Sequence, residues 1–282
     1  TRSVSHAGPV PFLITKSGTP ELTYAQSRRA GLRKPTRGVR TDAAARSWLD
    51  DVAAVALTLP TDAAFSHTTA AQLLGLPTPH PGGRPLHVTV QARRGTRKAV
   101  AWPQRGLSEV LTIGAVPVTG YRRTWMDLAG VLAVADLVAV TDVMLRRGLL
   151  ADLAVPPGTR GAPVLRDAAA LADPRSRSVR ESLLRVELHQ RGLPAPEINL
   201  DIIEEGEWLG CGDLVWRAYR LIIEYDGIHH GERRQRHQDA QTRNAYAEHG
   251  WECLVWTGRH FRDLHASVDQ VERVMRTRGW EG

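Results

Sequence analysis

Hydrophobic positions in the first part of the chain recur at spacings that predict a small mixed module. Apolar residues across 42–59 repeat every three to four positions, the period of an amphipathic helix. Ser66 is placed to cap a second helix that runs through Leu74. Apolar and polar residues then alternate at 86–91, near Val100, at 111–113 and at 116–118, which predicts short strands. We therefore expect an α+β module here.

The rest of the chain reads first as helices and then as strands. Helical spacing continues at about 122–133, 135–145 and 163–171, and a break at 173–176 precedes an amphipathic helix that starts at Ser178. Two strand-like runs, 211–216 and 220–227, are joined by a few polar residues and predict a hairpin. We place the main domain boundary at the break, which gives regions 1–172 and 173–282.

Composition excludes several classes of protein. The 282 residues are 42% hydrophobic, which falls outside the disordered and collagen-like classes. The apolar run 131–140 is shorter than the ~20 residues of a membrane span and is broken by Asp136, so we expect no membrane partner. No long apolar stretch follows Thr1, and the two cysteines form no C-x-x-C pattern. A globular protein of the reducing cytoplasm is the simplest expectation.

The net charge of +7 is distributed unevenly along the chain. Residues 1–172 carry 21 basic and 11 acidic side chains, whereas 173–282 carry 16 and 19. This excess indicates either a polyanion-binding surface or merely a solvated basic face. The opening basic stretch reads as a short helix, turn and strand, or as a flexible arm. The candidate phosphate contacts in the first region are Arg33, Lys34, Arg37, Arg93, Arg94, Arg97 and Lys98.

Acidic residues in the second region suggest a metal site. Glu224 and Asp226 project from the same face of an otherwise apolar strand, which is costly without a cation. Asp213 on the paired strand could lie beside them, and clustered carboxylates suit a hard ion such as Mg²⁺ or Mn²⁺. The alternative is that Asp213 and Asp226 are turn residues beside Gly212 and Gly227, which leaves Glu224 unexplained.

Other polar residues in this region each carry two interpretations. Ser178 and Glu181 form an S-x-x-E pattern, so Glu181 is either a helix cap or a site residue. Asp239 and Arg243 are spaced as a surface helix pair. His230 fits a proton-transfer group or phosphate donor beside the carboxylates better than a zinc ligand, because no cysteine pair accompanies it.

These residues, taken in order, resemble a known family. The set is Glu181, Asp213, Glu224-Tyr225-Asp226-Gly227, His230, Asp239, Arg243 and Gly250-Trp251. It resembles the PD-(D/E)xK nuclease fold, specifically its very-short-patch-repair-endonuclease-like branch, over about residues 176–265. The resemblance implies a restriction-endonuclease-like mixed sheet flanked by helices. It also implies that Asp213 and Glu224 bind the metal and that Glu181 completes the site.

The sequence departs from the general motif at one position. No lysine follows Lys98, and Asp226 stands where the motif has its lysine, so the group that activates water is either Asp226 or His230. The zinc site of very-short-patch-repair enzymes is also not reproduced, because too few cysteines are present.

The first region resembles AbiEi-type antitoxin domains. The residues that carry this resemblance are Arg37-Gly38-Val39, Ser66 to Ala71, Leu74 to Pro77, and Val118-Thr119 through Arg123-Thr124 to Asp127-Leu128-Ala129. It implies a winged-helix-like start and DNA binding. His67 is either a contact with DNA or, as we favour, a packing residue.

The combined expectation is a magnesium-dependent DNA endonuclease or nickase acting in repair or defence. Double-stranded DNA is the expected partner, with Arg233, Arg234 and Arg243 as further contacts, and a homodimer is one allowed oligomeric state. The alternative is an antitoxin-type DNA-binding regulator with an inactive nuclease fold. An RNA-cleaving toxin is a third hypothesis.

Overall fold

Contacts within the chain define two compact units, Thr1–Val131 and Leu132–Gly282, which are described separately. The computed structural model describes residues 12–13, 31–44, 46–83, 85–90, 100–101, 109–225 and 233–282, and for 12–13, 100–101 and 233–239 it describes the backbone only. Both units combine helices with sheets, so the expected mixed α+β class is confirmed. No helix in the described part of the chain is long and apolar enough to span a bilayer.

Unit 1 contains two sheets among its described residues. Its elements in chain order are β1 (Phe12–Leu13), β2 (Leu32–Arg33), β3 (Val39–Asp42), α1 (Trp48–Ala56), β4 (Ala63–Phe65), α2 (His67–Leu73), β5 (Leu86–Val90), β6 (Val100–Ala101), β7 (Val110–Ile113), β8 (Val116–Thr119) and α3 (Tyr121–Leu128). A three-stranded sheet has the order β1-β3-β2 and a five-stranded sheet the order β6-β5-β4-β8-β7. Strand β4 is antiparallel to β5 and parallel to β8, so the larger sheet is mixed.

Most predicted elements of unit 1 are confirmed, but two helix boundaries are displaced and β4 was not predicted: α3 ends at Leu128 rather than near residue 133. Helix α1 begins at Trp48, not at residue 42, because Thr41 and Asp42 pair with β2. Its start is fixed by a capping box in which Ser47 Oγ accepts from Asp50 N and Asp50 Oδ2 accepts from Ser47 N. The inward face of α1 packs with β4 and β5 in a core that includes Val52, Val55 and Phe65.

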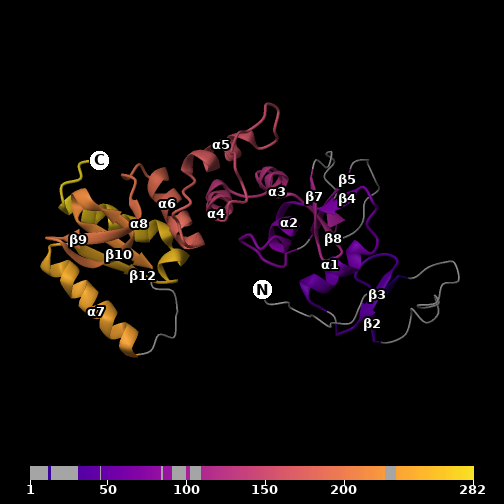
Figure 1. Ribbon diagram of the computed structural model, residues 1–282, viewed down its shortest axis with the longest axis horizontal. Helices are drawn as coiled ribbons and strands as arrows, with labels where there is room; N and C mark the ends of the chain where they lie inside the picture. Colours follow the sequence, from indigo (N-terminus) through magenta and orange to yellow (C-terminus); the bar gives the residue numbers. More distant parts are fainter. Residues whose placement is uncertain are drawn as a thin grey trace. The chain divides into compact units, whose positions relative to one another are not determined.

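Unit 2 is a four-stranded mixed sheet with helices on both faces (Figure 1). Its elements are α4 (Val134–Arg146), α5 (Ala162–Leu171), α6 (Val179–Gln190), β9 (Glu197–Glu204), β10 (Glu207–Trp216), η2 (Arg217–Tyr219), β11 (Leu221–Tyr225), α7 (Arg233–Glu248), β12 (Glu252–Trp256), η3 (His260–Arg262) and α8 (Leu264–Thr277). The strand order is β12-β11-β10-β9. Strands β9, β10 and β11 form an antiparallel meander, and β12 is parallel to β11 after the crossover through α7.

The two faces of this sheet bury separate cores. Leu214 and Ile223 pack with side chains of α6 and α8, such as Leu188. Val215 and Ile222, the next pair along the same strands, pack on the opposite face with Tyr246 of α7. The predicted hairpin and the mixed sheet flanked by helices are therefore confirmed.

Strand β9 is an element that the sequence analysis did not predict. Asn199 adopts a left-handed backbone conformation with φ of 48°. This kink separates Ile198, which packs on the α6 and α8 face, from Leu200, which packs on the α7 face. The strand consequently lacks the strict alternation by which strands are recognised.

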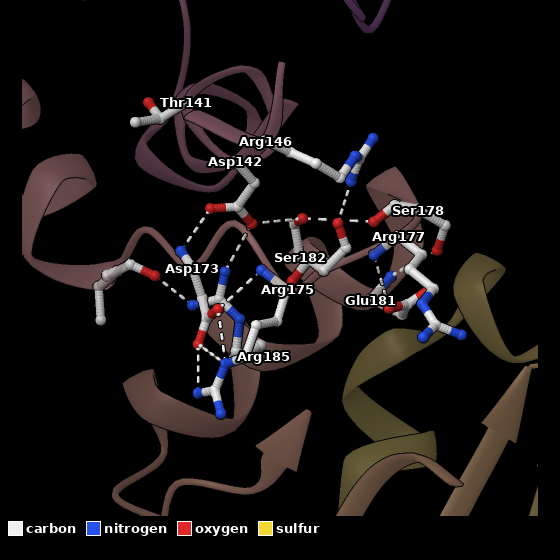
Figure 2. A network of polar contacts seen from close by, with 12 residues as sticks. Thr141, Asp142, Arg146, Asp173, Arg175, Arg177, Ser178, Glu181, Ser182 and Arg185 are labelled. Carbon is white, nitrogen blue, oxygen red and sulfur yellow. Dashed lines mark hydrogen bonds and ion pairs between the residues drawn. The ribbon is translucent and has the colours of Figure 1, made fainter. Parts of the chain in front are cut away.

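The contacts assign residues 132–172 to unit 2, whereas the sequence boundary was placed at residue 173. The physical reason is a buried polar network around Asp142 of α4, whose residue is 1% exposed (Figure 2). Asp142 accepts hydrogen bonds from Asp173 N at 2.6 Å, from Ser182 Oγ at 2.7 Å and from Arg185 Nη2 at 2.6 Å. Helix α4 is thereby joined to α6 by a charged contact that no local pattern reveals.

Removal of the Asp142 carboxylate should destabilise unit 2. In Asp142→Ala, Arg185 loses its buried partner, and breaking such a pair costs about 3 kcal/mol or more. Denaturant unfolding of the full chain, monitored by tryptophan fluorescence, measures the change. Asp167→Ala, an exposed carboxylate on α5, is the control and should change stability by less than about 0.5 kcal/mol. If the two substitutions lower the free energy of unfolding equally, the Asp142 network does not stabilise unit 2 in the way described.

Candidate functional site

The β10–β11 hairpin brings two of the predicted carboxylates together. Leu214 pairs with Ile223, so the next position along each strand places Asp213 opposite Glu224. Asp213 Oδ2 accepts a hydrogen bond of 2.7 Å from Tyr225 N, which fixes its side chain across the end of β11. One oxygen of Asp213 is thus held by the protein, and the strand pairing sets the positions of both carboxylates.

Glu181 reaches the same region from the first turn of α6. Ser178 Oγ accepts from Glu181 N at 3.2 Å, as the capping interpretation predicts. The Glu181 carboxylate does not close the box onto Ser178, because its Oε2 accepts from Arg177 N and from Asn199 Nδ2, each at 2.9 Å. Glu181 is therefore both a helix-start residue and a 6% exposed carboxylate whose charge reaches Asp213.

Burial gives Asp213 an unusual proton affinity. Partial burial, and next the negative charge of Glu181, raise the pKa of Asp213 from 3.8 to about 6, while Arg177 counteracts them. A carboxyl group in this state is most stable when a cation lies beside it.

Glu224 lies among side chains from α7 and β12. Burial and the charge of Asp213 raise the pKa of Glu224, and Arg243, the Cys253 thiol and the Tyr246 hydroxyl counteract this shift. The same carboxylate, after burial, raises the pKa of the Cys253 thiol to about 12. Arg243, predicted as a DNA contact, therefore lies near enough to Glu224 to stabilise its charge.

One buried polar atom beside the carboxylates, Asn199 Oδ1 on the residue that holds Glu181, has no hydrogen-bond partner among the described residues. Uncompensated buried oxygens are rare in folded proteins and require an explanation such as an ion or ordered water. Asp213 and Glu224 supply carboxylate oxygens, the type of ligand that Mg²⁺ or Mn²⁺ prefers.

The described residues do not complete a metal site by themselves. No group of three or more His, Cys, Asp or Glu within them is close enough to hold an ion. The structure brings Asp213 near Glu224 and near Glu181, but does not gather all three into one such group. Asp226 and His230, the predicted water-activating residues, lie outside the described residues.

The predicted DNA contacts fall into three groups. Arg93, Arg94, Arg97 and Lys98 lie outside the described residues, as do the side chains of Arg233 and Arg234 on α7. Lys34 and Arg37 are exposed near the β2–β3 turn. Arg33 is instead held by Asp51, with 2.7 Å between Nη1 and Oδ1.

His67 packs within unit 1. Its ring stacks on His87 with 5.2 Å between centroids, and its Nδ1 lies 3.0 Å from Ser66 Oγ. The side chain is only 13% exposed, which fits a packing residue better than a contact with DNA.

Comparisons with known proteins add no relative. A scan against protein-family models, a search of curated proteins and a search of solved structures each found no match to this chain. The function must therefore be argued from the residues themselves.

The sequence analysis missed Asn199 and Tyr246 as site residues. Asn199 carried one usable signal, since an asparagine that interrupts an alternating run often adopts the left-handed conformation. No sequence signal marks Tyr246, because a tyrosine in a polar helix is usually an ordinary packing residue.

Asp213→Asn should stabilise the metal-free protein at neutral pH. A carboxyl whose pKa is raised from 3.8 to about 6 lowers the free energy of unfolding once it ionises, and this penalty is absent below about pH 4 and complete above about pH 6. Allowing for its partial exposure, we expect a gain of about 1 kcal/mol at pH 7.5 and none at pH 4. Urea unfolding in EDTA at both pH values tests this.

The control for this substitution is Asp201→Asn on the exposed side of β9. It should show no comparable gain that depends on pH. If Asp213→Asn instead lowers the free energy of unfolding at pH 7.5, the ionised Asp213 carboxylate does not destabilise the fold.

Gly210→Ala should disturb the Tyr246 side of the site. A Cβ at Gly210 would overlap Tyr246 Oη and lie 2.8 Å from Thr242 Cγ2, so we expect a loss of about 1–3 kcal/mol from overpacking. In a Tyr246→Phe background the closest atom is removed, and the same glycine substitution should cost less. A double-mutant cycle by urea unfolding measures the difference, and strict additivity would show that the two residues do not meet.

Proposed function

We propose that unit 2 is a divalent-metal-dependent endonuclease or nickase that hydrolyses phosphodiester bonds in double-stranded DNA. The observation that carries the proposal is the Asp213–Glu224 pair, two carboxylates held on adjacent strands with raised pKa values. Two partly buried carboxylates are costly to the fold unless a bound cation offsets their negative charge. The ordered resemblance of residues 176–265 to the PD-(D/E)xK nucleases supports the same reaction.

The residues that would hold Mg²⁺ or Mn²⁺ are Asp213 and Glu224, with Glu181 nearby. A divalent cation there supplies Lewis-acid stabilisation of the charge that builds up on the phosphate oxygens. Tyr225 N fixes Asp213 Oδ2, and Arg243 favours the ionised form of Glu224, so the chain presents oriented acceptors. Asp226 or His230 would take the proton of the attacking water, in place of the absent lysine.

The basic first region would hold the duplex through phosphate contacts. Its excess of ten positive charges over residues 1–172 favours polyanions irrespective of sequence. Lys34 and Arg37, both exposed, are its candidates among the described side chains.

One observation favours a second function, a DNA-binding regulator of the antitoxin type. Glu181 Oε2 already accepts two hydrogen bonds, and the described carboxylates form no complete three-residue group. A protein of this kind would bind DNA without cutting it, and Asp213→Ala would not alter that binding.

Cleavage assays separate the two functions. Supercoiled plasmid, mismatched and modified duplexes, and duplex RNA are incubated with the full chain in Mg²⁺, Mn²⁺ or EDTA. We expect metal-dependent nicking or linearisation of DNA that falls at least 100-fold in Asp213→Ala and in Glu224→Ala, because each removes a proposed metal ligand. Glu207→Ala, an exposed carboxylate on β10, is the control and should retain full activity.

DNA that stays intact under every metal while remaining bound would support the regulator instead. Cleavage of RNA alone would favour the toxin hypothesis. Cleavage that survives both alanine substitutions would place the active site elsewhere.

A further inference from the structure

The carboxyl ends of the parallel strands β11 and β12 lie beside the first turn of α6. The Asp213–Glu224 pair lies at this same end of the sheet. The Arg180 guanidinium carbon lies 4.7 Å from the Tyr225 ring centroid and 5.6 Å from that of Phe261. Tyr225 ends β11 and Phe261 belongs to η3 after β12, so Arg180 joins α6 to both strand ends. Arg177 immediately precedes the cap of α6, and its backbone N donates to Glu181 Oε2 at 2.9 Å, so it lies at the same helix start.

Four arginines lie on the segments that meet here, two at the α6 start and two in the segment 259–262, which contains Phe261. We call them the arginine rim: Arg177, Arg180, Arg259 and Arg262. All four are exposed, and none forms an ion pair with an acidic residue in the part of the chain that the structure describes. Asp263, the acidic neighbour of Arg262, is engaged in capping α8 through Ala266 N.

Five other arginines of unit 2 each form an ion pair with a carboxylate: Arg185 with Asp142, Arg191 with Asp269, Arg217 with Glu197, Arg276 with Glu272 and Arg278 with Glu252. Arg160, Arg166 and Arg273 are exposed like the rim and form no ion pair among the described residues, but they lie on other segments. What distinguishes the rim is its place: its arginines lie on the two segments that contact the end of β11 beside Asp213 and Glu224. Arginines that are not neutralised by nearby carboxylates attract phosphate groups, because the guanidinium can donate two parallel hydrogen bonds to the phosphate oxygens.

The segment that carries two of these arginines is held in place before any ligand binds. His260 stacks on Trp256 with an interplanar angle of 8°, and its Nδ1 accepts a 2.9 Å hydrogen bond from Thr257 N. Ser267 Oγ donates to His260 O at 3.1 Å, which joins the segment to α8. A fixed backbone lowers the conformational entropy lost when these side chains bind a polyanion.

We infer that the arginine rim binds the phosphate backbone of the DNA strand that enters the Asp213–Glu224 site. The inference rests on the proposed function for the choice of DNA, but it concerns binding and requires no cleavage. It adds contact residues within unit 2 to those already proposed in the first region and on α7. Phosphate contacts of this type position the duplex without reading its sequence.

The test compares two pairs of exposed arginines. Arg180→Gln with Arg259→Gln removes two rim charges, and Arg217→Gln with Arg276→Gln removes two charges that are ion-paired elsewhere in unit 2. Binding of a labelled duplex to the full chain is measured by fluorescence anisotropy in EDTA over a range of salt concentrations. Each lost phosphate contact lowers the slope of log K against log salt by about 0.9.

We expect the rim pair to lower this slope by about 1.8 and the affinity at 150 mM salt by about tenfold or more, and the control pair to change neither. Arg180→Lys with Arg259→Lys keeps the charges and should keep the slope, which excludes a loss caused by misfolding. An unchanged slope in the rim pair, or equal losses in both pairs, would overturn the inference. Tighter rim-dependent binding to duplex RNA than to DNA would also overturn it.

The same experiment distinguishes this failure from failure of the proposed function. If the protein never cleaves DNA but its binding depends on the rim arginines, the nuclease proposal is refuted and the inference about the rim is supported. If the protein cleaves DNA in a metal-dependent way but the salt slope is unchanged in the rim variants, the nuclease proposal is supported and the inference about the rim is refuted.

Discussion

The pairing of β10 with β11 is the constraint on which the candidate site depends. It places Asp213 and Glu224 on adjacent strands at the edge where β11 ends, and the hydrogen bond from Tyr225 N holds Asp213 there. Two partly buried negative charges at this spacing oppose folding, as the raised pKa values of both groups indicate. Unit 2 tolerates them because the sheet is covered on both faces by apolar cores.

The surrounding helices supply the charged and polar side chains that act on the two carboxylates. Helix α6 brings Glu181 and Arg177 to Asp213, and α7 brings Arg243 and Tyr246 to Glu224. Helix α6 is itself fixed by the Asp142 network from α4, so residues far from the site determine where its first turn lies. The buried Asp142–Arg185 ion pair therefore influences the electrostatics of the carboxylates through the position of α6.

Much of this could be predicted from the sequence, and the failures have physical reasons. Helices α4, α5 and α6 were predicted within about two residues, since apolar spacing and breaks at Gly and Pro mark them clearly. Glu224 was singled out as a candidate because a charged residue inside an apolar strand is costly without a partner. Strand β9 was missed because the left-handed Asn199 switches its buried face, and the arginine rim was missed because only tertiary contacts bring α6 and η3 together.

The proposed function depends on a divalent cation that binds to the Asp213–Glu224 pair. Isothermal titration calorimetry of Mg²⁺ and Mn²⁺ into the full chain at pH 7.5, without nucleic acid, tests this binding directly. We predict saturable binding that is lost in Asp213→Asn and in Glu224→Gln and is retained in Asp201→Asn. Absence of saturable binding in the unmodified protein, or equal binding in all variants, would contradict the proposed function.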